Sequence, residues 1–316
     1  MKKDEYIKIA SSIFDNDWDE NSTVTCEQYI ISQFQGTAFD SDYRCYKVQW
    51  SEWEYLGNVR LANTVRCTMV AKITTEGEAF ILQELQKKEL PAPKILAIVR
   101  LNNEKVMIFE QMFAGTELYS KAEHNAWIDA ATALSHIHSS FWHIEDTAPE
   151  VANKVQVKTT ILEKIHRAQA SVSHRSLWRR YMSQAQDRLA TAPKTLIHGD
   201  TFPTNILVNG GQISFVDWAD SSVFAYMMDI GRLTAIIDTK TMKPMCPCPN
   251  EVTRAYYESI NALLKIDYPE YMRDVRMAQF IELAAIYTPI RYPRINNAYN
   301  QVIEDELNKI ALGDCG

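Results

Sequence analysis

The sequence has no long apolar run and no excess of basic residues. Nowhere do the about 18 consecutive apolar residues of a transmembrane helix occur. Residues 1–19 are charged and lack the apolar core of about 7 to 15 residues that marks a signal peptide. The formal net charge is -7, so no basic surface for nucleic acid is indicated. We therefore expect a cytoplasmic protein that neither spans a membrane nor binds nucleic acid.

Cysteine and glycine are also scarce. The six cysteines are scattered along the chain, which favours reduced thiols over a disulfide framework. The segment CPCP, from Cys246 to Pro249, could be half of a metal site, but no second cysteine pair follows it, and an ordinary loop is the favoured interpretation. Only ten glycines occur, and they form no G-x-G-x-x-G motif. What remains is an ordinary globular composition in 316 residues, enough for one large domain or two smaller lobes.

The first part of the chain has strand character. Runs rich in β-branched and aromatic residues occur between residues 43 and 111, namely YRCYKVQW, VRCTMVAKI and KVMIFEQM. One amphipathic helix, expected over residues 76–89, interrupts them and ends at LPAP because proline cannot continue a helix. These elements predict a small β-rich N-terminal lobe with one helix, residues 1–112.

The rest of the chain has helical character. After Gly115 apolar residues recur at helical spacing, starting with a helix for which Ser120 and Glu123 would form a capping box. Further amphipathic helices are expected over about 159–190, 250–265 and 269–288. The pattern predicts a larger, mainly helical C-terminal lobe, residues 113–316, so the expected fold class is α+β.

One stretch interrupts this helical half, LIHGDTFPTNILVNGGQISFVDWAD. Its runs ILV and ISFV flank Asn-Gly-Gly, which predicts a hairpin because asparagine and glycine tolerate positive φ. With the turn centred near Gly210 or Gly211, Asn205 falls approximately opposite Asp217, about 5 Å away at Cβ. Mg²⁺ accepts amide and carboxylate oxygens, and water and phosphate complete its shell. The hairpin therefore predicts a cation site at its mouth, with Asp200 pointing into the same space.

Each of these polar residues has an ordinary explanation when taken singly. Asn205 and Asp217 could simply be polar residues at the end of a hairpin, and Asp200 could be a turn former. All three occur together, however, with His198 just before Asp200 and with apolar strands in register. The combination favours a functional site.

The same residues resemble the signature of the aminoglycoside phosphotransferase and choline kinase group. That signature is His-Gly-Asp, four residues, Asn, and later an Asp followed by an aromatic residue. The resemblance implies a bilobal protein-kinase-like fold, small-molecule kinase activity, and Asp200 as the catalytic base. It implies that Asn205 and Asp217 hold Mg²⁺ on the nucleotide phosphates, which agrees with the positioning and charge neutralisation that phosphoryl transfer needs. His198 is expected to order the catalytic loop, and FAYMMDIGRL supplies Asp229 as the buried carboxylate that stabilises it.

A kinase also needs a lysine on a central strand of its first lobe and a carboxylate on the following helix. TMVAKI supplies Lys72, which would be costly to bury without a partner. Glu78 shares a helix face with the apolar residues at 81, 82 and 85, whereas Glu84 is rotated about 120° from that face. We therefore expect Lys72 to pair with Glu78. A strand-edge lysine whose ammonium group reaches water is the alternative.

The segment MIFEQMFAG resembles the family's hinge. Backbone groups near Glu110 and Met112 would contact the adenine of ATP or the guanine of GTP. The chain departs from the protein-kinase pattern because no Gly-rich loop is present to cover the phosphates, and Gly57 in WEYLGNVRL is the sole candidate for that place. The resemblance extends over roughly residues 43–240.

The sequence indicates the molecule that accepts the phosphoryl group less clearly than it indicates the reaction. The family implies a hydroxyl on a small, cationic or sugar-like molecule. An aminoglycoside-type antibiotic, and hence a role in antibiotic resistance, is the first candidate, and choline, a nucleoside or another metabolite follows. Aromatic residues after Asp217 could enclose a quaternary ammonium, although we expect most of them in the core. A catalytically inactive nucleotide-binding relative is the second function class, but the presence of Lys72, Asp200, Asn205 and Asp217 favours an active kinase.

Overall fold

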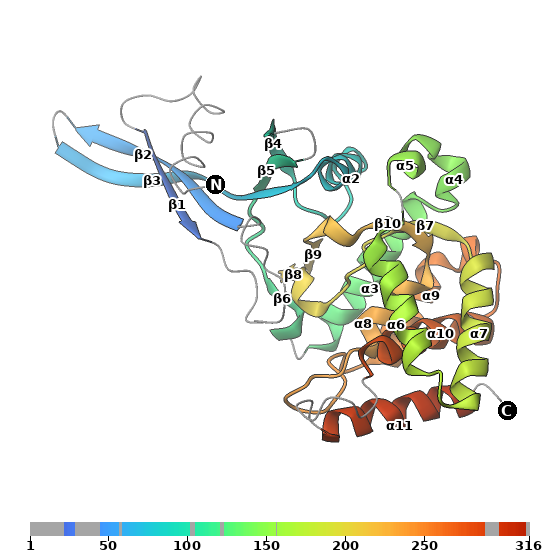
Figure 1. Ribbon diagram of the computed structural model, residues 1–316. Helices are drawn as coiled ribbons and strands as arrows, with labels where there is room; N and C mark the ends of the chain where they lie inside the picture. The colour runs from blue at the N-terminus through green and yellow to red at the C-terminus, as the bar shows by residue number, and fades with distance from the viewer. Residues whose placement is uncertain are drawn as a thin grey trace. The chain divides into compact units, whose positions relative to one another are not determined.

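The computed structural model describes residues 22–28, 45–56, 59–101, 105–120, 123–155, 157–287 and 297–313. The chain divides into two compact units, unit 1 (residues 1–114) and unit 2 (residues 115–316) (Figure 1). In its described residues unit 1 holds an antiparallel sheet and helix α2 (Glu76–Lys87), and unit 2 is mainly helical, so the fold class is α+β as expected. The nucleotide-binding and catalytic roles expected of the two lobes stay predictions.

Unit 1 contains a five-stranded antiparallel sheet with the strand order β1-β2-β3-β5-β4. Its strands are β1 (Ser22–Gln28), β2 (Cys45–Leu56), β3 (Val59–Thr75), β4 (Ile95–Arg100) and β5 (Lys105–Gln111). β2, β3 and β5 overlap the three runs with strand character, whereas β1 and β4 were not expected. Because β3 pairs with β2 on one side and β5 on the other, Lys72 lies on an interior strand and not at the edge of the sheet.

Helix α2 (Glu76–Lys87) follows β3 directly. Thr75 is its N-cap, and the threonine hydroxyl accepts the backbone N–H of Glu78 at 3.3 Å. The helix ends two residues earlier than expected, because Glu89 adopts a left-handed backbone with φ 54°. Glu89 and Leu90 donate their N–H groups back to the carbonyl oxygens of residues 86 and 85, both at 3.0 Å. This hydrogen-bond pattern is a Schellman motif, so it terminates the helix before the prolines are reached.

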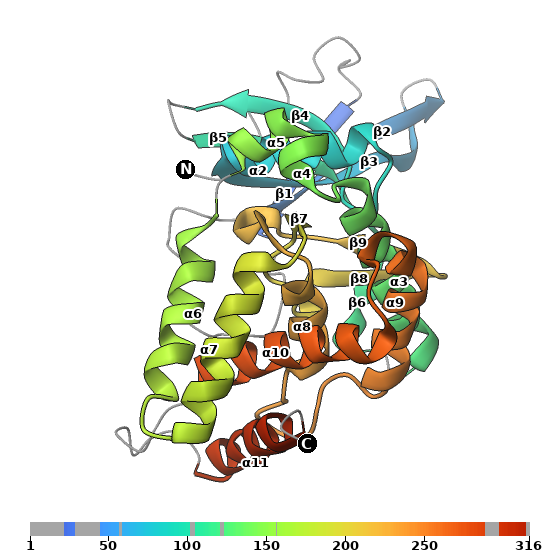
Figure 2. The same ribbon diagram turned by 90° about the vertical axis from the view of Figure 1, so that its right-hand side faces the viewer.

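Unit 2 is built mainly from helices. They are α3 (His124–Ser140), α4 (Ile144–Thr147), α5 (Pro149–Lys154), α6 (Thr159–Ser171), α7 (Ser176–Thr191), α8 (Met227–Ala235), α9 (Pro249–Leu264), α10 (Tyr268–Ile286) and α11 (Asn297–Gly313). α10 contacts α6, α7, α8, α9 and α11, and so it runs through the middle of the unit (Figure 2). The helix expected over 159–190 is two helices, because the chain turns between Ser171 and Ser176 without a proline or glycine to mark the break. α11 was not expected.

The capping box expected at the start of α3 is wrong. The helix begins at His124 with Glu123 as its N-cap, and no side chain caps it. Ser120 instead ends a short 3₁₀ turn, η1 (Leu118–Ser120), where its hydroxyl donates to the carbonyl oxygen of Glu117 at 2.6 Å. Ser120 therefore lies too far before the helix to cap it.

Short strands of unit 2 lie on either side of the loop of residues 198–205. They are β6 (Thr116–Glu117), β7 (Lys194–Ile197), β8 (Ile206–Asn209), β9 (Gln212–Phe215) and β10 (Ser222–Ala225). β6, β8 and β9 form one sheet, and β7 pairs with β10 in another. β7, β8 and β9 lie in or beside the stretch that the sequence marks as an interruption of the helices, whereas β6 and β10 were not expected.

The expected hairpin is present as β8 and β9. Gly210 and Gly211 have φ values of 53° and 84°, the positive values that a two-residue hairpin turn needs. The resulting register places Asn205 across from Val216, whose backbone N–H donates to the Asn205 carbonyl oxygen at 2.9 Å. The expected pairing of Asn205 with Asp217 is therefore off by one residue, because the turn is centred between the two glycines.

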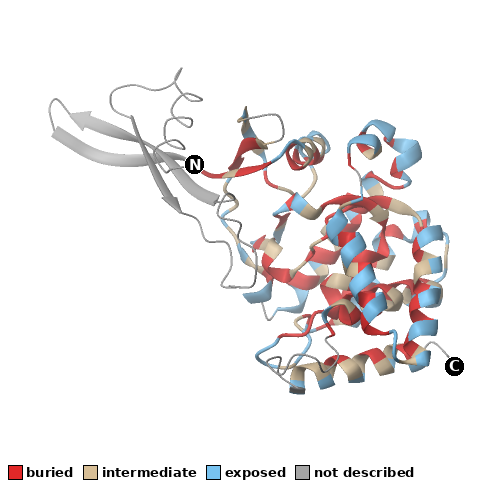
Figure 3. Cartoon of the chain, in the orientation of Figure 1, coloured by how far each residue is buried: buried red, intermediate tan, exposed pale blue. Residues whose placement is uncertain are grey.

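The core of unit 2 includes a close approach of α8 and α10. A Cβ atom on Gly231 would lie 2.4 Å from the Cβ of Ala278, so the two helices can approach only because residue 231 has no side chain. Arg232 follows Gly231, and Glu282 lies about one helical turn after Ala278. Figure 3 shows buried residues on the facing sides of the unit 2 helices and exposed residues on their outer sides.

Candidate active site

Asp229, in the first turn of α8, holds the loop of residues 198–205. Its Oδ2 accepts the backbone N–H of His198 at 2.6 Å, and its Oδ1 accepts that of Gly199 at 2.9 Å. The Nε2 of His138 lies 3.1 Å from the same Oδ2, and the Asp229 side chain is only 1% exposed. Burial alone would raise the pKa of Asp229, but its interactions with His138 and then His198 lower it. The carboxylate therefore stays ionised and holds the start of the loop in place.

His198 connects this loop to the end of the hairpin. Its Nδ1 accepts the backbone N–H of Asp200 at 3.3 Å, and its Nε2 lies 3.0 Å from the carbonyl oxygen of Val216. Because Nδ1 accepts, the proton lies on Nε2, and the two contacts fix the tautomer of the ring. The buried ring also packs on Trp218 with a centroid separation of 4.6 Å. His198 thereby holds the loop against the residues on either side of Asp217.

Gly199 allows the loop to pass close to Asp220. Its φ is +81°, and a Cβ atom there would lie only 2.3 Å from the backbone oxygen of Asp220. Both the backbone conformation and the available space therefore require glycine at this position.

The two carboxylate oxygens of Asp200 have different partners. Oδ1 accepts from Arg232, at 2.8 Å from Nε and through a second bond from Nη2. Oδ2 accepts from the side-chain amide of Asn205 at 3.0 Å, and the same amide donates to the Asp200 backbone oxygen. Burial would raise the pKa of Asp200, but the charge of the Arg232 guanidinium lowers it below its usual value. Asp200 is therefore an ionised hydrogen-bond acceptor with a fixed orientation.

Sequence reasoning missed Arg232, Glu282 and Lys164. Arg232 also donates from Nη1 to Glu282 at 2.8 Å, and Lys164 donates to the other oxygen of Glu282 at 2.8 Å. Signals in the sequence could have found Arg232 and Glu282, but not Lys164. Arg232 lies three residues after Asp229 and so on the same side of α8, and Glu282 interrupts the apolar run of AQFIELAAI, where an unpaired carboxylate would be costly to bury.

A cavity of about 290 Å³ opens beside Asp200. The charged residues in its lining are Asp200, Asp220, Glu282, Lys164, Arg167 and Arg232, so acidic and basic groups are equal in number. The lining residues come from α6, the 198–205 loop, α8 and α10, together with Asp220, and include no aromatic side chain among the residues that the structure describes. A molecule bound here would lie against the carboxylate of Asp200.

Asn205 and Asp217 lie near the end of the hairpin, and each has a side-chain oxygen that could bind a cation. The Asn205 Nδ2 is used by Asp200, which leaves the amide Oδ1 as the group that can bind a cation. Asp217 is exposed and has φ 65°, a left-handed conformation that costs a non-glycine residue about 1 to 3 kcal/mol. Such strain is typical of functional positions, and an amide oxygen with a carboxylate fits a hard cation such as Mg²⁺.

The described residues include no cluster of three or more His, Cys, Asp or Glu side chains that could hold a metal, and this covers Cys246 and Cys248. Both thiols are buried, and burial raises the pKa of Cys246 to about 12. These cysteines therefore have the surroundings of packed thiols.

Within unit 1, Lys72 and Glu78 form the expected ion pair. The Glu78 side chain is 2% exposed, and its second oxygen accepts from the hydroxyl of Thr74. Glu110, which sequence reasoning considered only for its backbone, is also buried and has its carboxylate 4.0 Å from the Lys72 ammonium. Met112 lies just after β5, in a segment without regular structure. The role of these residues in nucleotide binding stays a prediction, and Gly57 lies outside the described residues.

Residues 43–244, nearly two thirds of the chain, match the model of the phosphotransferase enzyme family. The chain belongs to that family. The phosphotransferase also resembles solved structures over nearly its whole length. A choline kinase from Cryptosporidium parvum aligns with a TM-score of 0.61 at 13% identity, covering 100% of this chain and 97% of the other. A spectinomycin phosphotransferase bound to ADP and spectinomycin aligns with a TM-score of 0.56 at 12% identity, covering 99% and 98%.

An amicoumacin kinase aligns with a TM-score of 0.58 at 11% identity, covering 99% of the phosphotransferase and 94% of that kinase. No curated protein sequence matches the phosphotransferase. At these identities the structural matches establish the fold, which is the bilobal kinase-like fold expected from the sequence. The family establishes that this is a small-molecule kinase, and it does not specify the acceptor.

Among the aromatic residues after Asp217 that were considered for a cation cage, Trp218, Tyr226, Tyr256 and Tyr287 are buried in the core, whereas Phe224, Tyr257 and Tyr299 are partly exposed. Tyr226 and Tyr256 are fully buried and stack with a centroid separation of 6.5 Å, and Tyr256 stacks in turn on Tyr271 at 6.1 Å. Trp218 is fully buried against His198. Tyr292 lies outside the described residues.

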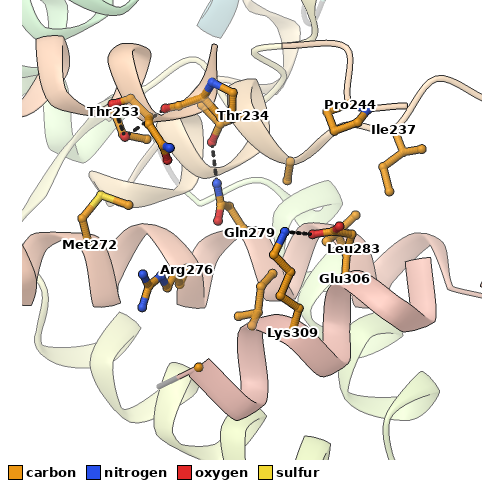
Figure 4. A pocket seen from close by; sticks show the side chains of 15 residues that line it. Thr234, Ile237, Pro244, Thr253, Met272, Arg276, Gln279, Leu283, Glu306 and Lys309 are labelled. Carbon is orange, nitrogen blue, oxygen red and sulfur yellow. Dashed lines mark hydrogen bonds and ion pairs between the residues drawn. The ribbon is translucent and has the colours of Figure 1, made fainter. Parts of the chain in front are cut away.

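A larger cavity, of about 410 Å³, lies between α8, α9, α10 and α11 (Figure 4). Gln279 donates to the hydroxyl of Thr234 there at 2.9 Å, and Arg276 and Lys309 also line it. It contains no residue of the 198–205 loop, so it is separate from the cavity beside Asp200.

Among the described residues, no helix combines the length and the apolar character needed to cross a membrane.

Proposed function

We propose that this phosphotransferase is an active kinase that transfers the γ-phosphoryl group of ATP or GTP to a hydroxyl of a small molecule. The observation that carries the proposal is the state of Asp200. It is an ionised carboxylate, oriented by Arg232 and Asn205, at the edge of a cavity of about 290 Å³. Phosphoryl transfer needs mainly positioning and charge stabilisation from the protein, and both are built into this loop.

Each residue of the site has a distinct role in the proposal. Asp200 is the catalytic base that accepts the proton of the acceptor hydroxyl. Asn205 and Asp217 would hold Mg²⁺, which supplies neutralisation of the phosphate charge when bound. His198 and Asp229 support the loop through the contacts described above. Each of these five side chains comes from unit 2, residues 115–316, which is therefore proposed as the catalytic and substrate-binding unit.

Unit 1 is proposed to bind the nucleotide. Lys72 would contact its phosphates, held in place by Glu78, since the ion pair keeps the ammonium group at a fixed point of the sheet. Backbone groups near Glu110 and Met112 would contact the base. The ion pair supports this proposal because it holds the ammonium group of the partly exposed Lys72 in one position, as contact with a phosphate requires.

For the acceptor we propose an aminoglycoside-like, sugar-like molecule. The cavity beside Asp200 offers both acidic and basic hydrogen-bonding groups, which suits a molecule rich in hydroxyl and amino groups. Its lining lacks aromatic side chains in the described part of the chain, so it provides no cation–π cage for choline. A nucleoside or another metabolite, and an inactive nucleotide-binding relative, are the alternatives. A cytoplasmic location and a role in antibiotic resistance stay predictions.

The test is incubation of the protein with MgATP or MgGTP and a panel of aminoglycosides, choline, nucleosides and sugars. Mass spectrometry should find the mass of one phosphate added to a panel member, and the identity of that member gives the acceptor class. Asp200→Ala, run in parallel, should give no such product. If no acceptor gains mass and no Mg-dependent nucleotide binding is detected by calorimetry, the proposed activity is wrong.

A further inference from the structure

We infer that Arg232 and Glu282 are positioning residues for phosphoryl transfer. Arg232 holds one oxygen of Asp200, so that the other oxygen is presented to the acceptor hydroxyl, and Glu282 holds Arg232. The inference rests on the proposed function of Asp200 as the catalytic base. It concerns residues that touch neither the acceptor hydroxyl nor the phosphates, and that act through Asp200.

The contacts of the Asp200 carboxylate determine which of its oxygens is available. Each carboxylate oxygen can accept about two hydrogen bonds. Oδ1 already accepts two, both from the Arg232 guanidinium. Oδ2 accepts one from Asn205 at 3.0 Å and can accept another. The acceptor hydroxyl therefore donates to Oδ2, and the bonds to Arg232 and Asn205 hold the plane of the carboxylate in the orientation that presents this oxygen.

Arg232 is itself fixed by contacts on its other side. Its Nη1 donates to Glu282 at 2.8 Å, and its guanidinium lies over the ring of Phe202 at 5.8 Å from the centroid. The planar guanidinium presents its donors at fixed angles, so anchoring Nη1 also sets the direction of Nε and Nη2 toward Asp200. A lysine at this position would keep the charge but could not make both sets of contacts.

Glu282 can serve as the anchor because it is buried and doubly paired. Its side chain is 3% exposed, and its two oxygens accept from Arg232 and Lys164, each at 2.8 Å. A buried carboxylate is unfavourable unless it is paired, so Glu282 keeps both cations close. The tight contact of Gly231 with Ala278 fixes the backbones of α8 and α10 beside this pair.

The chain contains a matched ion pair that can serve as a control. Arg188 binds Asp274 through two bonds of 2.7 Å, and the Asp274 side chain is 3% exposed. Asp274 lies on α10, the same helix as Glu282, but neither member of the pair contacts the 198–205 loop in the hydrogen bonds described. Loss of this pair should therefore affect stability without affecting Asp200.

The kinetic test uses hydrolysis of MgATP by the full-length protein, with water as the acceptor, followed by phosphate release. We expect Arg232→Lys and Glu282→Gln each to lower the rate at saturating MgATP about 100-fold, since a misplacement near 1 Å has that effect, while KM for MgATP changes less than about twofold. Arg188→Lys and Asp274→Asn should change the rate per folded molecule less than about twofold, whatever their effect on Tm. The double variant R232K/E282Q should be no slower than the slower single variant, because both changes disturb the same contact.

Three kinetic results would overturn the inference. In the first, R232K and E282Q hydrolyse MgATP as fast as the control variants. In the second, the two substitutions change only KM for MgATP. In the third, the rate reductions of the two single variants multiply in the double variant. Circular dichroism of each variant confirms folding, and E282Q provides the test if R232K does not fold.

A crystal structure of Glu282→Gln tests the geometry without depending on activity. The inference expects Arg232 to have left Oδ1 of Asp200, with an N···O distance beyond about 4 Å, the limit for an ion pair. An unchanged contact would overturn it. If the wild-type protein releases no more phosphate than Asp200→Ala and modifies no acceptor of the panel, the proposed function fails, and this structure still decides whether Glu282 positions Arg232 against Asp200.

Discussion

The carboxylate of Asp229 accepts the backbone N–H of His198 at 2.6 Å, although the two residues are separated by the whole β8–β9 hairpin. The contact joins α8 to the first residue of the loop that carries Asp200. A buried, ionised side chain thus determines the backbone path of a polar loop.

Replacement of Asp229 should destabilise the fold. In Asp229→Asn one oxygen acceptor becomes an NH₂ group that faces a backbone N–H of the loop, which leaves buried donors without acceptors. We expect a loss of about 3 kcal/mol in the free energy of unfolding, measured by urea denaturation. Asp187→Asn, at an exposed position of α7, is the control and should change it by less than about 0.5 kcal/mol. A loss from D229N as small as that of the control would contradict the anchoring role.

The same carboxylate predicts how stability depends on pH. The pKa of Asp229 is lowered in the folded protein, so the unfolded chain binds its proton first as the pH falls. The stabilisation is complete above about pH 4, the pKa of Asp in an unfolded chain, and is lost as the pH falls from there through the folded pKa. Urea denaturation between pH 7 and pH 3 should show a smaller decrease in Asp229→Asn than in the wild type. Parallel curves would show that another group is responsible.

The close approach of α8 and α10 should be sensitive to one methyl group. Gly231→Ala places a Cβ atom 2.4 Å from the Cβ of Ala278, and overpacking of this kind costs about 1 to 3 kcal/mol. Ala278→Gly in the same chain removes the opposing methyl group and should restore part of the loss, as measured by thermal unfolding. If G231A and the double variant unfold at the same temperature, this contact does not limit the approach of the helices.

Lys72 should contribute to nucleotide binding. Lys72→Met removes an ammonium group that is held by Glu78, and we expect kcat/KM for MgATP to fall about 10- to 100-fold, the range for losing hydrogen bonds to a charged group. Lys87→Met is the control, because that lysine is 68% exposed and pairs only with Glu84 on the same helix in the contacts described. If kcat/KM falls equally in both variants, Lys72 acts through its charge alone and not through a specific contact with the nucleotide.

Local signals in the sequence account for what could be predicted. Asn-Gly-Gly between apolar runs predicted the hairpin, because positive φ at two adjacent residues permits few other structures. The burial of Glu78 followed from the period of α2, and with it the ion pair to Lys72. The predicted register of the hairpin was off by one residue. The register depends on which residues occupy the turn, and the sequence Asn-Gly-Gly allows more than one position for the turn centre.

Contacts between distant segments could not be predicted in this way. Glu282 lies 50 residues after Arg232, and the two meet only because α8 packs on α10. Termination of α2 by a Schellman motif depends on the backbone of Glu89, a residue that rarely adopts positive φ, so the following prolines were the more visible signal. The strands β6 and β10, of two and four residues, are too short to show a period.

The most direct test of the central claim compares Asp200→Ala with Asp217→Ala, using phosphoryl transfer to the acceptor found in the panel and calorimetric binding of ADP with Mg²⁺. Asp200→Ala should lower kcat about 1,000-fold, within the range for loss of a general base, and should leave the Kd for MgADP nearly unchanged. Asp217→Ala should raise that Kd at least about 10-fold, as expected for loss of a metal ligand or its support. Equal and modest effects of the two substitutions on both quantities would contradict the assignment of Asp200 as the base and Asp217 as a metal ligand.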